Sequence, residues 1–257
     1  MRKCSCLSLF ISFVSITTFS KCLAQAAPGD SSSQQNAFNN AITLYKTSIG
    51  NQSPLYNGKE YYFYDPLIKG TAYFMDIKGF TPGSVNFDRG FYDNVPMLYD
   101  LYIDEVVVLL YNNFSKFTLV KQKLKSFDFL GHHFININAD TININSGIRS
   151  GFYDELYHGK ISVLIKRTKN IQNSTGGSGV ERYFNAITDL YLKKDNTYYS
   201  VNGQSSLINI LKNKRKELQQ YIKSNQIKFR DNPEQAIVEI ATYYDHLTNW
   251  AWEKFTF

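Results

Sequence analysis

Residues 83–137 read GSVNFDRGFYDNVPMLYDLYIDEVVVLLYNNFSKFTLVKQKLKSFDFLGHHFINI. Short runs of β-branched and aromatic residues alternate there with polar residues, and turn residues end each run. This pattern predicts an antiparallel β-meander in which one face of the sheet packs against the core and the other is exposed to solvent. A helix is the competing interpretation of residues 97–110. The three consecutive valines from Val106 to Val108 favour a strand.

The first 26 residues have the three-part pattern of a secretory signal peptide. A basic start is followed by an apolar run over residues 7–19, and Ala24-Gln25-Ala26 supplies the small residues of a cleavage site. The apolar run is shorter than the roughly 20 residues that span a bilayer, which disfavours a retained N-terminal anchor. Cys22 raises the alternative of an acylated lipoprotein, but Lys21 stands where a small residue is expected. The sequence predicts an exported protein, periplasmic or associated with the cell envelope.

Removal of this segment changes the composition of the mature chain. All three cysteines lie within residues 1–26, so the mature chain has no disulfide, no thiolate nucleophile and no cysteine-ligated metal. Three of the 28 Lys and Arg residues also lie there, which leaves 25 against 22 Asp and Glu and lowers the net charge from +6 to +3. We therefore expect no nucleic-acid partner, and no membrane span in the mature chain.

The remaining chain divides into three regions. Residues 27–35 are rich in Pro, Gly, Ser and Gln and predict a flexible leader. Residues 36–203 predict a helix followed by the β-meander, and residues 204–257 predict two or three helices that pack on the sheet within the same globular unit. The expected class is α+β: a curved antiparallel meander with an N-terminal helix and C-terminal helices packed on it. The N-terminal helix is predicted from apolar residues at helical spacing, namely Phe38, Ile42, Tyr45 and Ile49.

Several local features of the meander can be predicted. The hairpin at Asp88-Arg89-Gly90 is expected to use Gly90 for a positive φ. Residues 60–65 predict a compact aromatic strand, and residues 173–179 (NSTGGSG) predict a flexible loop. A second hairpin is expected across residues 194–196. Three lysines are expected to alternate onto one solvated face: Lys121, Lys123 and Lys125.

The C-terminal region changes to helical spacing. Asn232-Pro233-Glu234-Gln235 is typical of a capped helix start, with Pro in the first turn and Gln at the capping-box position. The apolar positions that should face the sheet are Leu207, Ile208, Leu211, Leu218, Tyr221, Ile222, Ile237, Ile240, Ala241 and Tyr244.

Four segments together carry a resemblance to a known group of proteins. They are LYNGKEY (55–61), GSVNFD…FYDNVPMLYD (83–100), SGFYDELYHGK (150–160) and the tail over residues 196–245. In these segments the chain resembles exported proteins of unknown function that are common in Bacteroidota. The resemblance covers most of the mature chain and implies export, but it brings no activity and no site residues. Asp88-Arg89-Gly90 departs from the plain Asp-Gly turn that the group leads us to expect.

A search for catalytic and metal-binding motifs finds none. The four histidines are His132, His133, His158 and His246, and no two of them have the i, i+4 spacing of a helical metal site. His132 and His133 would point to opposite faces of a strand. There is no GxSxG elbow, P-loop or GxGxxG, so the sequence predicts no catalytic residue, no cofactor and no metal.

Two residue types remain as functional candidates. The acids around Asp93 and Asp100 could form the carboxylate pair of a glycan or peptide hydrolase, although acids at turns are normally solvated caps. Tyrosine is in excess, with 19 residues, and suits a recognition surface as well as half-buried strand positions. The early meander holds six of them: Tyr61, Tyr62, Tyr64, Tyr92, Tyr99 and Tyr102.

A curved meander with apolar inner positions resembles, in architecture alone, periplasmic carriers that hold a lipid or lipoprotein chain in a half-barrel. The preferred hypothesis is therefore a non-enzymatic envelope protein that binds a partner or an apolar ligand through a curved, tyrosine-rich sheet. An envelope hydrolase that uses Asp93 and Asp100 is the alternative.

Overall fold

The computed structural model describes residues 31–49, 54–139, 147–176 and 179–253. The predicted signal peptide lies outside these residues. The chain divides between Ser48 and Ile49 into two compact units, which are described separately. The first unit contains α1 (Ser31–Ile49), which is the helix predicted from the apolar spacing. α1 begins inside the predicted leader, and its side chains Phe38 and Tyr45 are exposed. Docking of this helix on the sheet stays a prediction.

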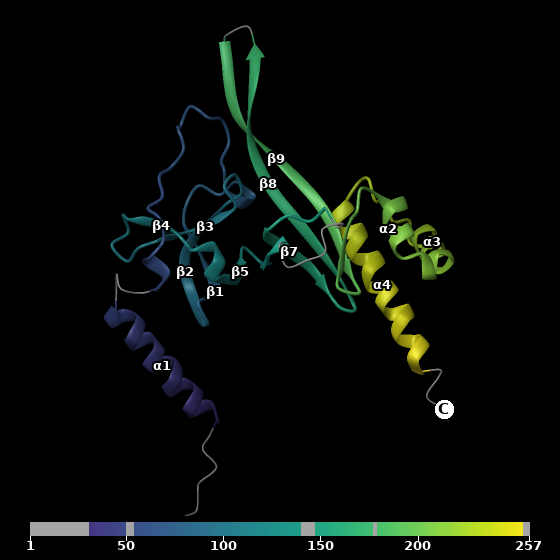
Figure 1. Ribbon diagram of the computed structural model, residues 1–257, viewed down its shortest axis with the longest axis horizontal. Coiled ribbons are helices and arrows are strands. Elements are labelled where there is room, and N and C mark those ends of the chain that lie inside the picture. Colours follow the sequence, from purple (N-terminus) through teal and green to yellow (C-terminus); the bar gives the residue numbers. More distant parts are fainter. Residues whose placement is uncertain (1–30, 50–53, 140–146, 177–178, 254–257) are drawn as a thin grey trace, which may run out of the picture. The chain divides into compact units, whose positions relative to one another are not determined.

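The second unit is an open, ten-stranded antiparallel sheet with helices at its C-terminal end (Figure 1). The α+β class predicted from the sequence is therefore confirmed. The strands are β1 (Thr81–Phe87), β2 (Gly90–Asp100), β3 (Glu105–Leu109), β4 (Lys116–Thr118), β5 (Leu124–Phe129), β6 (His132–Ile137), β7 (Gly151–His158), β8 (Ile161–Gly176), β9 (Gly179–Lys194) and β10 (Thr197–Ser200). The helices are α2 (Gln204–Ile210), α3 (Arg215–Ser224) and α4 (Pro233–Glu253).

The strand order departs once from a simple meander. It is β10-β9-β8-β7-β6-β5-β1-β2-β3-β4, so β5 pairs with β1 instead of with β4. The chain returns from the β4 edge through a 3₁₀ turn, Lys121–Lys123. Asn136 secures this crossing, because its side-chain amide donates to the carbonyl oxygens of Lys121 and Leu124, both at 2.8 Å. The expectation of one hairpin after another holds on both sides of this crossing but not across it.

The 3₁₀ turn Lys121–Lys123 also places the three lysines differently from the prediction. Lys121 donates to Asp104 at 2.6 Å and Lys123 donates to Asp88 at 2.8 Å, while Lys125 is exposed on β5. The expectation of three lysines on one solvated strand face was wrong. A 3₁₀ turn does not alternate its side chains as a strand does.

Two hairpin turns lie where the sequence placed them. Asp195 and Asn196 join β9 to β10, with φ values of 50° and 59°. Asp88 and Arg89 join β1 to β2, with φ values of 48° and 66°, and Gly90 is already paired with Phe87. The expectation that Gly90 supplies the positive φ was wrong. A two-residue turn of type I′ requires positive φ at both central residues, and these are Asp88 and Arg89.

Two predicted segments differ from the structure. Residues 61–65 form no strand ladder, although Glu60 bridges Phe117 and the Tyr61 amide donates to the carbonyl of Lys116 at 2.8 Å. Tertiary contacts of the tyrosine side chains override the strand propensity of this segment. The predicted loop at residues 173–179 is largely strand, because β8 runs to Gly176 and β9 starts at Gly179. Asn173 pairs with Arg182 in that ribbon.

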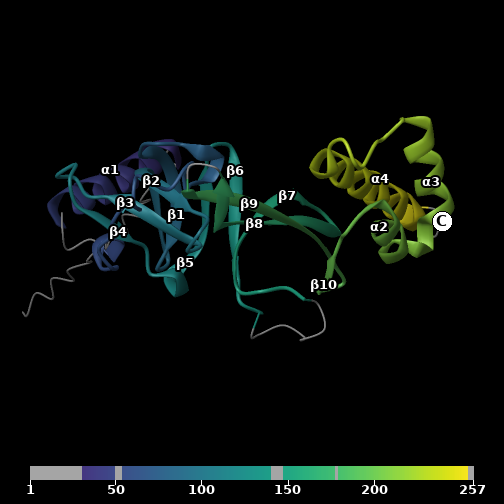
Figure 2. The ribbon, with the colours of Figure 1, turned by 90° about the horizontal axis from the view of Figure 1, so that it is seen from above.

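Separate apolar cores stabilise the two halves of this unit. Figure 2 shows α2, α3 and α4 grouped at one end of the sheet and strands β1 to β5 at the other. In the first half, β1 to β7 bury an aromatic cluster around Tyr99, Phe127, Phe134 and Phe152. In the second half, α2 to α4 cover β8 and β9. The predicted apolar positions are buried here except Tyr221, which is half-buried and stacks on Tyr243 at 3.9 Å between ring centroids.

The start of α4 confirms the predicted cap. The Asn232 side-chain oxygen accepts from the Gln235 amide at 3.2 Å, and Pro233 is the first helical residue. Across the described residues, none of the helices has the length and apolarity needed to span a membrane.

Candidate functional site

A cavity with four aromatic residues in its walls lies beside the segment 63–73. It has a volume of about 280 Å³. Segment 63–73 supplies most of its walls, and Phe184 of β9 closes one side. The lining residues are Phe63, Tyr64, Asp65, Pro66, Ile68, Gly70, Thr71, Ala72, Tyr73, Lys78 and Phe184, and we call this cavity the aromatic cleft.

Backbone pairing holds the cleft segment on the sheet. The Lys69 amide donates to the carbonyl of Arg182 at 2.9 Å, and the Phe184 amide donates to the carbonyl of Lys69 at 3.0 Å. The Leu101 amide donates to the carbonyl of Ala72 at 2.9 Å. The segment is therefore tied to β9 on one side and to the end of β2 on the other.

A buried lysine also positions this segment. The Lys169 ammonium donates to the carbonyl oxygens of Thr71 and Tyr73, both at 2.9 Å, and to Asp76 at 2.6 Å. Its side chain is only 6% exposed. The ion pair with Lys169 is the main cause that keeps the pKa of Asp76 below its usual value. An ammonium has three protons to donate, and here each has a protein acceptor.

Asp100 organises the floor of the cleft. Its side chain is fully buried at the end of β2 and accepts from the hydroxyls of Tyr61 at 2.8 Å and Tyr64 at 2.7 Å. Its second oxygen accepts from the amides of Tyr102 and Ile103 at 2.9 and 3.2 Å. Such multiple donation compensates for the removal of a carboxylate from water.

The same contacts fix the tyrosines in their protonated form. Burial is the first cause of the raised pKa of Tyr61 and of Tyr64, and the contact with Asp100 adds to it in both cases. Tyr73 lies 3.1 Å from Tyr61, hydroxyl to hydroxyl, and its pKa is also raised by burial. The tyrosine rings are thus held rigidly, which lowers the entropy cost of a contact with a ligand.

Apolar side chains around the cleft face solvent. Tyr62 is 72% exposed, Phe63 is 54% exposed and Leu67 is 78% exposed. Tyr64 makes edge contacts with Tyr102 and Phe184, at 5.5 and 5.3 Å between ring centroids. A cluster of exposed aromatic side chains around a preformed hollow is typical of a recognition surface.

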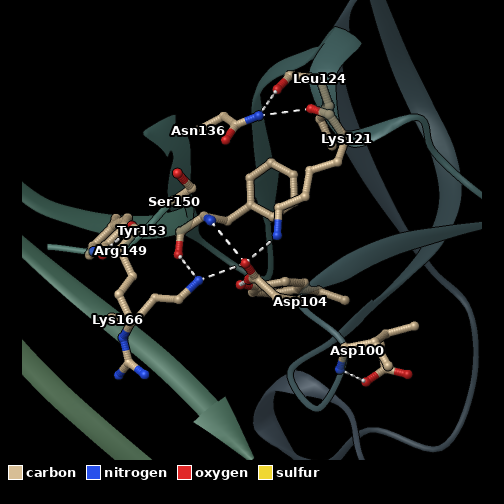
Figure 3. A network of polar contacts seen from close by, with 12 residues as sticks. Asp100, Asp104, Lys121, Leu124, Asn136, Arg149, Ser150, Tyr153 and Lys166 are labelled. Atoms are coloured by element: carbon tan, nitrogen blue, oxygen red, sulfur yellow. Dashed lines mark hydrogen bonds and ion pairs between the residues drawn. The ribbon is translucent and has the colours of Figure 1, made fainter. Parts of the chain in front are cut away.

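Asp104 forms a second polar cluster, in the turn between β2 and β3 (Figure 3). It accepts from the Tyr99 hydroxyl at 2.6 Å and pairs with Lys121 and Lys166 at 2.6 and 2.7 Å. Gly151 allows this approach, because a Cβ there would overlap both Asp104 and the Lys166 ammonium. Burial lowers the pKa of Lys166, and the charge of Asp104 opposes that shift. The side chains of this cluster satisfy one another, so we interpret the cluster as a structural lock between the end of β2 and β8.

A third charged cluster joins the sheet to α4. Asp154 is fully buried, and one of its oxygens accepts from His132 at 2.8 Å and from Arg167 at 2.8 Å. Arg167 also donates to both oxygens of Glu234, at 2.7 and 2.8 Å. A guanidinium that bridges two carboxylates fixes both the distance between them and their relative orientation. This cluster therefore fixes where α4 lies on β8.

The two acids of the hydrolase hypothesis do not come together. Asp93 and Asp100 both lie on β2, seven residues apart, which corresponds to about 23 Å along an extended strand. A glycosidase pair requires carboxyl groups roughly 5–10 Å apart. Asp100 is also enclosed by its four donors, whereas Asp93 is exposed and accepts from the Asn94 amide at 2.8 Å.

Asp93 instead lines a hollow of about 450 Å³ together with Asp128 and Ser84. Asp128 accepts from the Ser84 hydroxyl at 2.8 Å and contacts His133 at 2.6 Å. In a nucleophilic triad the histidine must lie between the serine and the acid. Here the acid lies between the other two, so Ser84 has no base to activate it.

The histidines follow the predicted geometry. His132 contacts Asp154, and His133 contacts Asp128 on the opposite face of β6. Across the described part of the chain, no group of three or more His, Cys, Asp or Glu side chains could hold a metal ion.

A hollow larger than the aromatic cleft is of a different kind. It has a volume of about 1160 Å³ and lies between β9, β10, the start of α2 and the residues that precede α4. Its walls carry hydroxyl and amide side chains together with Lys228, Arg230, Asp189 and Asp231. Aromatic residues contribute little to it, since Phe229 is its sole aromatic lining residue and is buried. It is therefore a poor match for a tyrosine-rich recognition site.

The sequence signalled part of the aromatic cleft. Of the six early tyrosines, Tyr61 and Tyr99 are buried, whereas Tyr62 and Tyr102 are exposed beside or near the cleft. The sequence does not indicate Phe184 of β9 or Lys169 of β8, because both lie about 100 residues away in the chain and only tertiary contacts bring them to residues 69–76. The aromatic density of residues 60–64 was the single signal available.

The chain was also compared with known proteins. No protein-family model matches it, no curated protein matches it, and no solved structure matches it.

Proposed function

We propose that this chain is a non-enzymatic protein of the cell envelope that binds a partner or an apolar ligand through the aromatic cleft. The observation that carries the proposal is the rigid, exposed aromatic surface around a hollow whose floor is fixed by Asp100. Export rests on the signal-peptide pattern of residues 1–26 and on the resemblance to exported proteins.

The size of the cleft narrows the class of ligand. Pockets that enclose a whole small molecule have volumes of roughly 300–1,000 Å³. The cleft has about 280 Å³, which suits one large apolar side chain or the end of an acyl chain. Exposed Tyr62, Phe63 and Leu67 would then extend the contact beyond the cleft. This arrangement, an anchor residue in a pocket with aromatic surroundings, is common at protein–protein hot spots.

Two observations favour binding over catalysis. The two acids of the hydrolase hypothesis lie seven residues apart on β2, and one of them is saturated with donors. The groups that line the cleft are aromatic and aliphatic, with Asp65 and Lys78 as its charged members. Asp65 is engaged by the Leu67 amide and by Arg182.

The test is native mass spectrometry and co-purification of the protein from its own cell envelope. We expect a retained lipid or one stoichiometric protein partner in the wild type. Phe63→Ala and Phe184→Ala should lose it, because they remove two walls of the cleft. The matched control is Phe91→Ala, which removes a similarly exposed phenylalanine of β2 that does not line the cleft. Retention of the partner by all three variants, or no bound species in the wild type, would contradict the proposal.

A further inference from the structure

The β8–β9 ribbon extends well beyond its neighbours in the sheet. β7 pairs with β8 only as far as Ile165, and β10 pairs with β9 only from Tyr191 onward. The two ribbon strands remain paired with each other from there to Gly176 and Gly179. In Figure 1 the end of this ribbon projects beyond the other strands of the sheet. An isolated two-stranded ribbon is only marginally stable in water, so a projecting one calls for an explanation.

The two edges of the ribbon differ. On the β9 edge, Lys69 exchanges hydrogen bonds with Arg182 and Phe184, and its ammonium pairs with Glu181 at 2.7 Å. That edge is therefore covered by the segment that also lines the aromatic cleft. On the β8 edge, the last contact is the Lys169 amide, which donates to the carbonyl of Leu101 at 3.0 Å.

Beyond Lys169 the backbone of the β8 edge has no neighbour among the described residues. Outward and inward backbone groups alternate along a strand. Because the Lys169 amide points outward, the amide and carbonyl groups of Ile171, Asn173 and Thr175 also point outward. No backbone or side-chain group of the described chain pairs with them. Residues 172–175 are exposed.

This edge also lacks the features that keep sheet edges apart. Natural proteins protect free edges with charged side chains, proline or bulges. Residues 170–176 read NIQNSTG, with no charge and no proline, and their register with β9 continues without a shift. The edge is thus open to another strand.

We propose that a second copy of this chain pairs with the β8 edge, in an antiparallel arrangement centred on Asn173. A two-fold axis there would place Asn173 opposite Asn173 of the other copy and Ile171 opposite its Thr175. Antiparallel self-pairing satisfies the same backbone groups on both copies and closes the assembly as a dimer. It brings no like charges together, because residues 170–176 are uncharged. The cleft segment lies on the β9 edge and stays accessible.

Proline substitutions test the dimer by analytical ultracentrifugation of the full chain. Asn173→Pro removes an amide that points outward, so no hydrogen bond within the ribbon is lost. We expect the wild type to be a dimer and Asn173→Pro to be a monomer. The matched control is Val180→Pro, which lies opposite Thr175, two residues nearer the tip of the ribbon, on the β9 edge, where the amide also points outward. It should remain a dimer. All three proteins should show the same circular dichroism.

Three outcomes overturn the proposal: a monomeric wild type, a dimer that persists in Asn173→Pro, or a dimer that is lost equally in Val180→Pro.

Cysteine crosslinking tests the register independently. In a background where Cys4, Cys6 and Cys22 are serine, Asn173→Cys should form a disulfide dimer on mild oxidation. Directly opposed residues in a hydrogen-bonded antiparallel pair are about 5.5 Å apart between Cα atoms. A disulfide spans roughly 4.4–6.8 Å. Val180 is 66% exposed in the wild type, and Val180→Cys should crosslink far less. Equal crosslinking at both positions overturns the register.

Discussion

At the scale of single residues, Asp100 shows how a buried acid can serve structure instead of catalysis. Its two oxygens accept from Tyr61, Tyr64, Tyr102 and Ile103, and its side chain has no contact with solvent. A carboxylate can accept from all of these donors, whereas a carboxamide replaces one acceptor oxygen with a donor. The aromatic cleft therefore depends on the acceptor oxygens of a single buried residue.

Asp100→Asn should lower the free energy of unfolding by about 1–3 kcal/mol, because at least one donor is left facing another donor. Urea denaturation followed by circular dichroism measures this change. The matched control is Asp93→Asn on the same strand, which is exposed and should change stability by no more than about 0.5 kcal/mol. If the two variants were equally stable, Asp100 would not anchor the cleft.

At the scale of elements, α4 is part of the core. Ile237, Ile240 and Ala241 are completely buried against β8, β9 and the other helices, and Glu234 is held by Arg167. The Lys214 side chain, just before α3, is partly exposed at 26%, its partner Glu217 is exposed at 44%, and their ion pair spans 3.6 Å. Exposed pairs of this kind contribute little to stability.

Ile240→Asp should therefore unfold the second half of the sheet unit, because it buries an unpaired charge in place of a side chain worth about 1.5–3 kcal/mol. Lys214→Glu is the surface control and should leave the thermal transition nearly unchanged. The measurement is the cooperative melting curve of each variant. A shortened chain that ends near Gly203 and keeps the wild-type melting transition would contradict this prediction. The C-terminal helices would then be a separate module.

At the scale of the whole molecule, buried tyrosines link stability to alkaline pH. Burial raises the pKa of Tyr61, Tyr64, Tyr99 and Tyr153 above the ordinary value of about 10. In the unfolded chain these hydroxyls ionise near pH 10, while the folded chain keeps their protons. Their contribution to stability is therefore complete below about pH 10 and is lost as the pH rises toward the folded pKa values.

A titration of tyrosinate absorbance should accordingly show two phases. The more accessible hydroxyls ionise first, and the buried set ionises only together with the loss of circular dichroism. In a denaturant the same 19 tyrosines should titrate in one phase near pH 10. A single gradual phase in the native protein, with the fold intact throughout, would show that these hydroxyls are open to solvent.

Local patterns in the sequence determined most of the elements of this protein. Alternation over residues 83–137 predicted strands such as β2, because a strand with one packed face must repeat every two residues, and the consecutive valines Val106 to Val108 predicted β3. Helical spacing and the Asn232 cap predicted α4, because a cap acts within a single turn. Where the expectation was wrong at Gly90 and at residues 60–65, a neighbouring segment decided the backbone geometry.

Only the tertiary structure decided which distant segments meet. The pairing of β1 with β5, the contact of Lys69 with β9 and the enclosure of Asp100 by Tyr61 and Tyr64 join residues that lie between 36 and more than 100 positions apart. No local pattern encodes such pairings, because their free energy arises from burial and hydrogen bonds that exist only once both partners are in place. The individual strands and helices could thus be derived from the sequence. The aromatic cleft exists only in the folded chain.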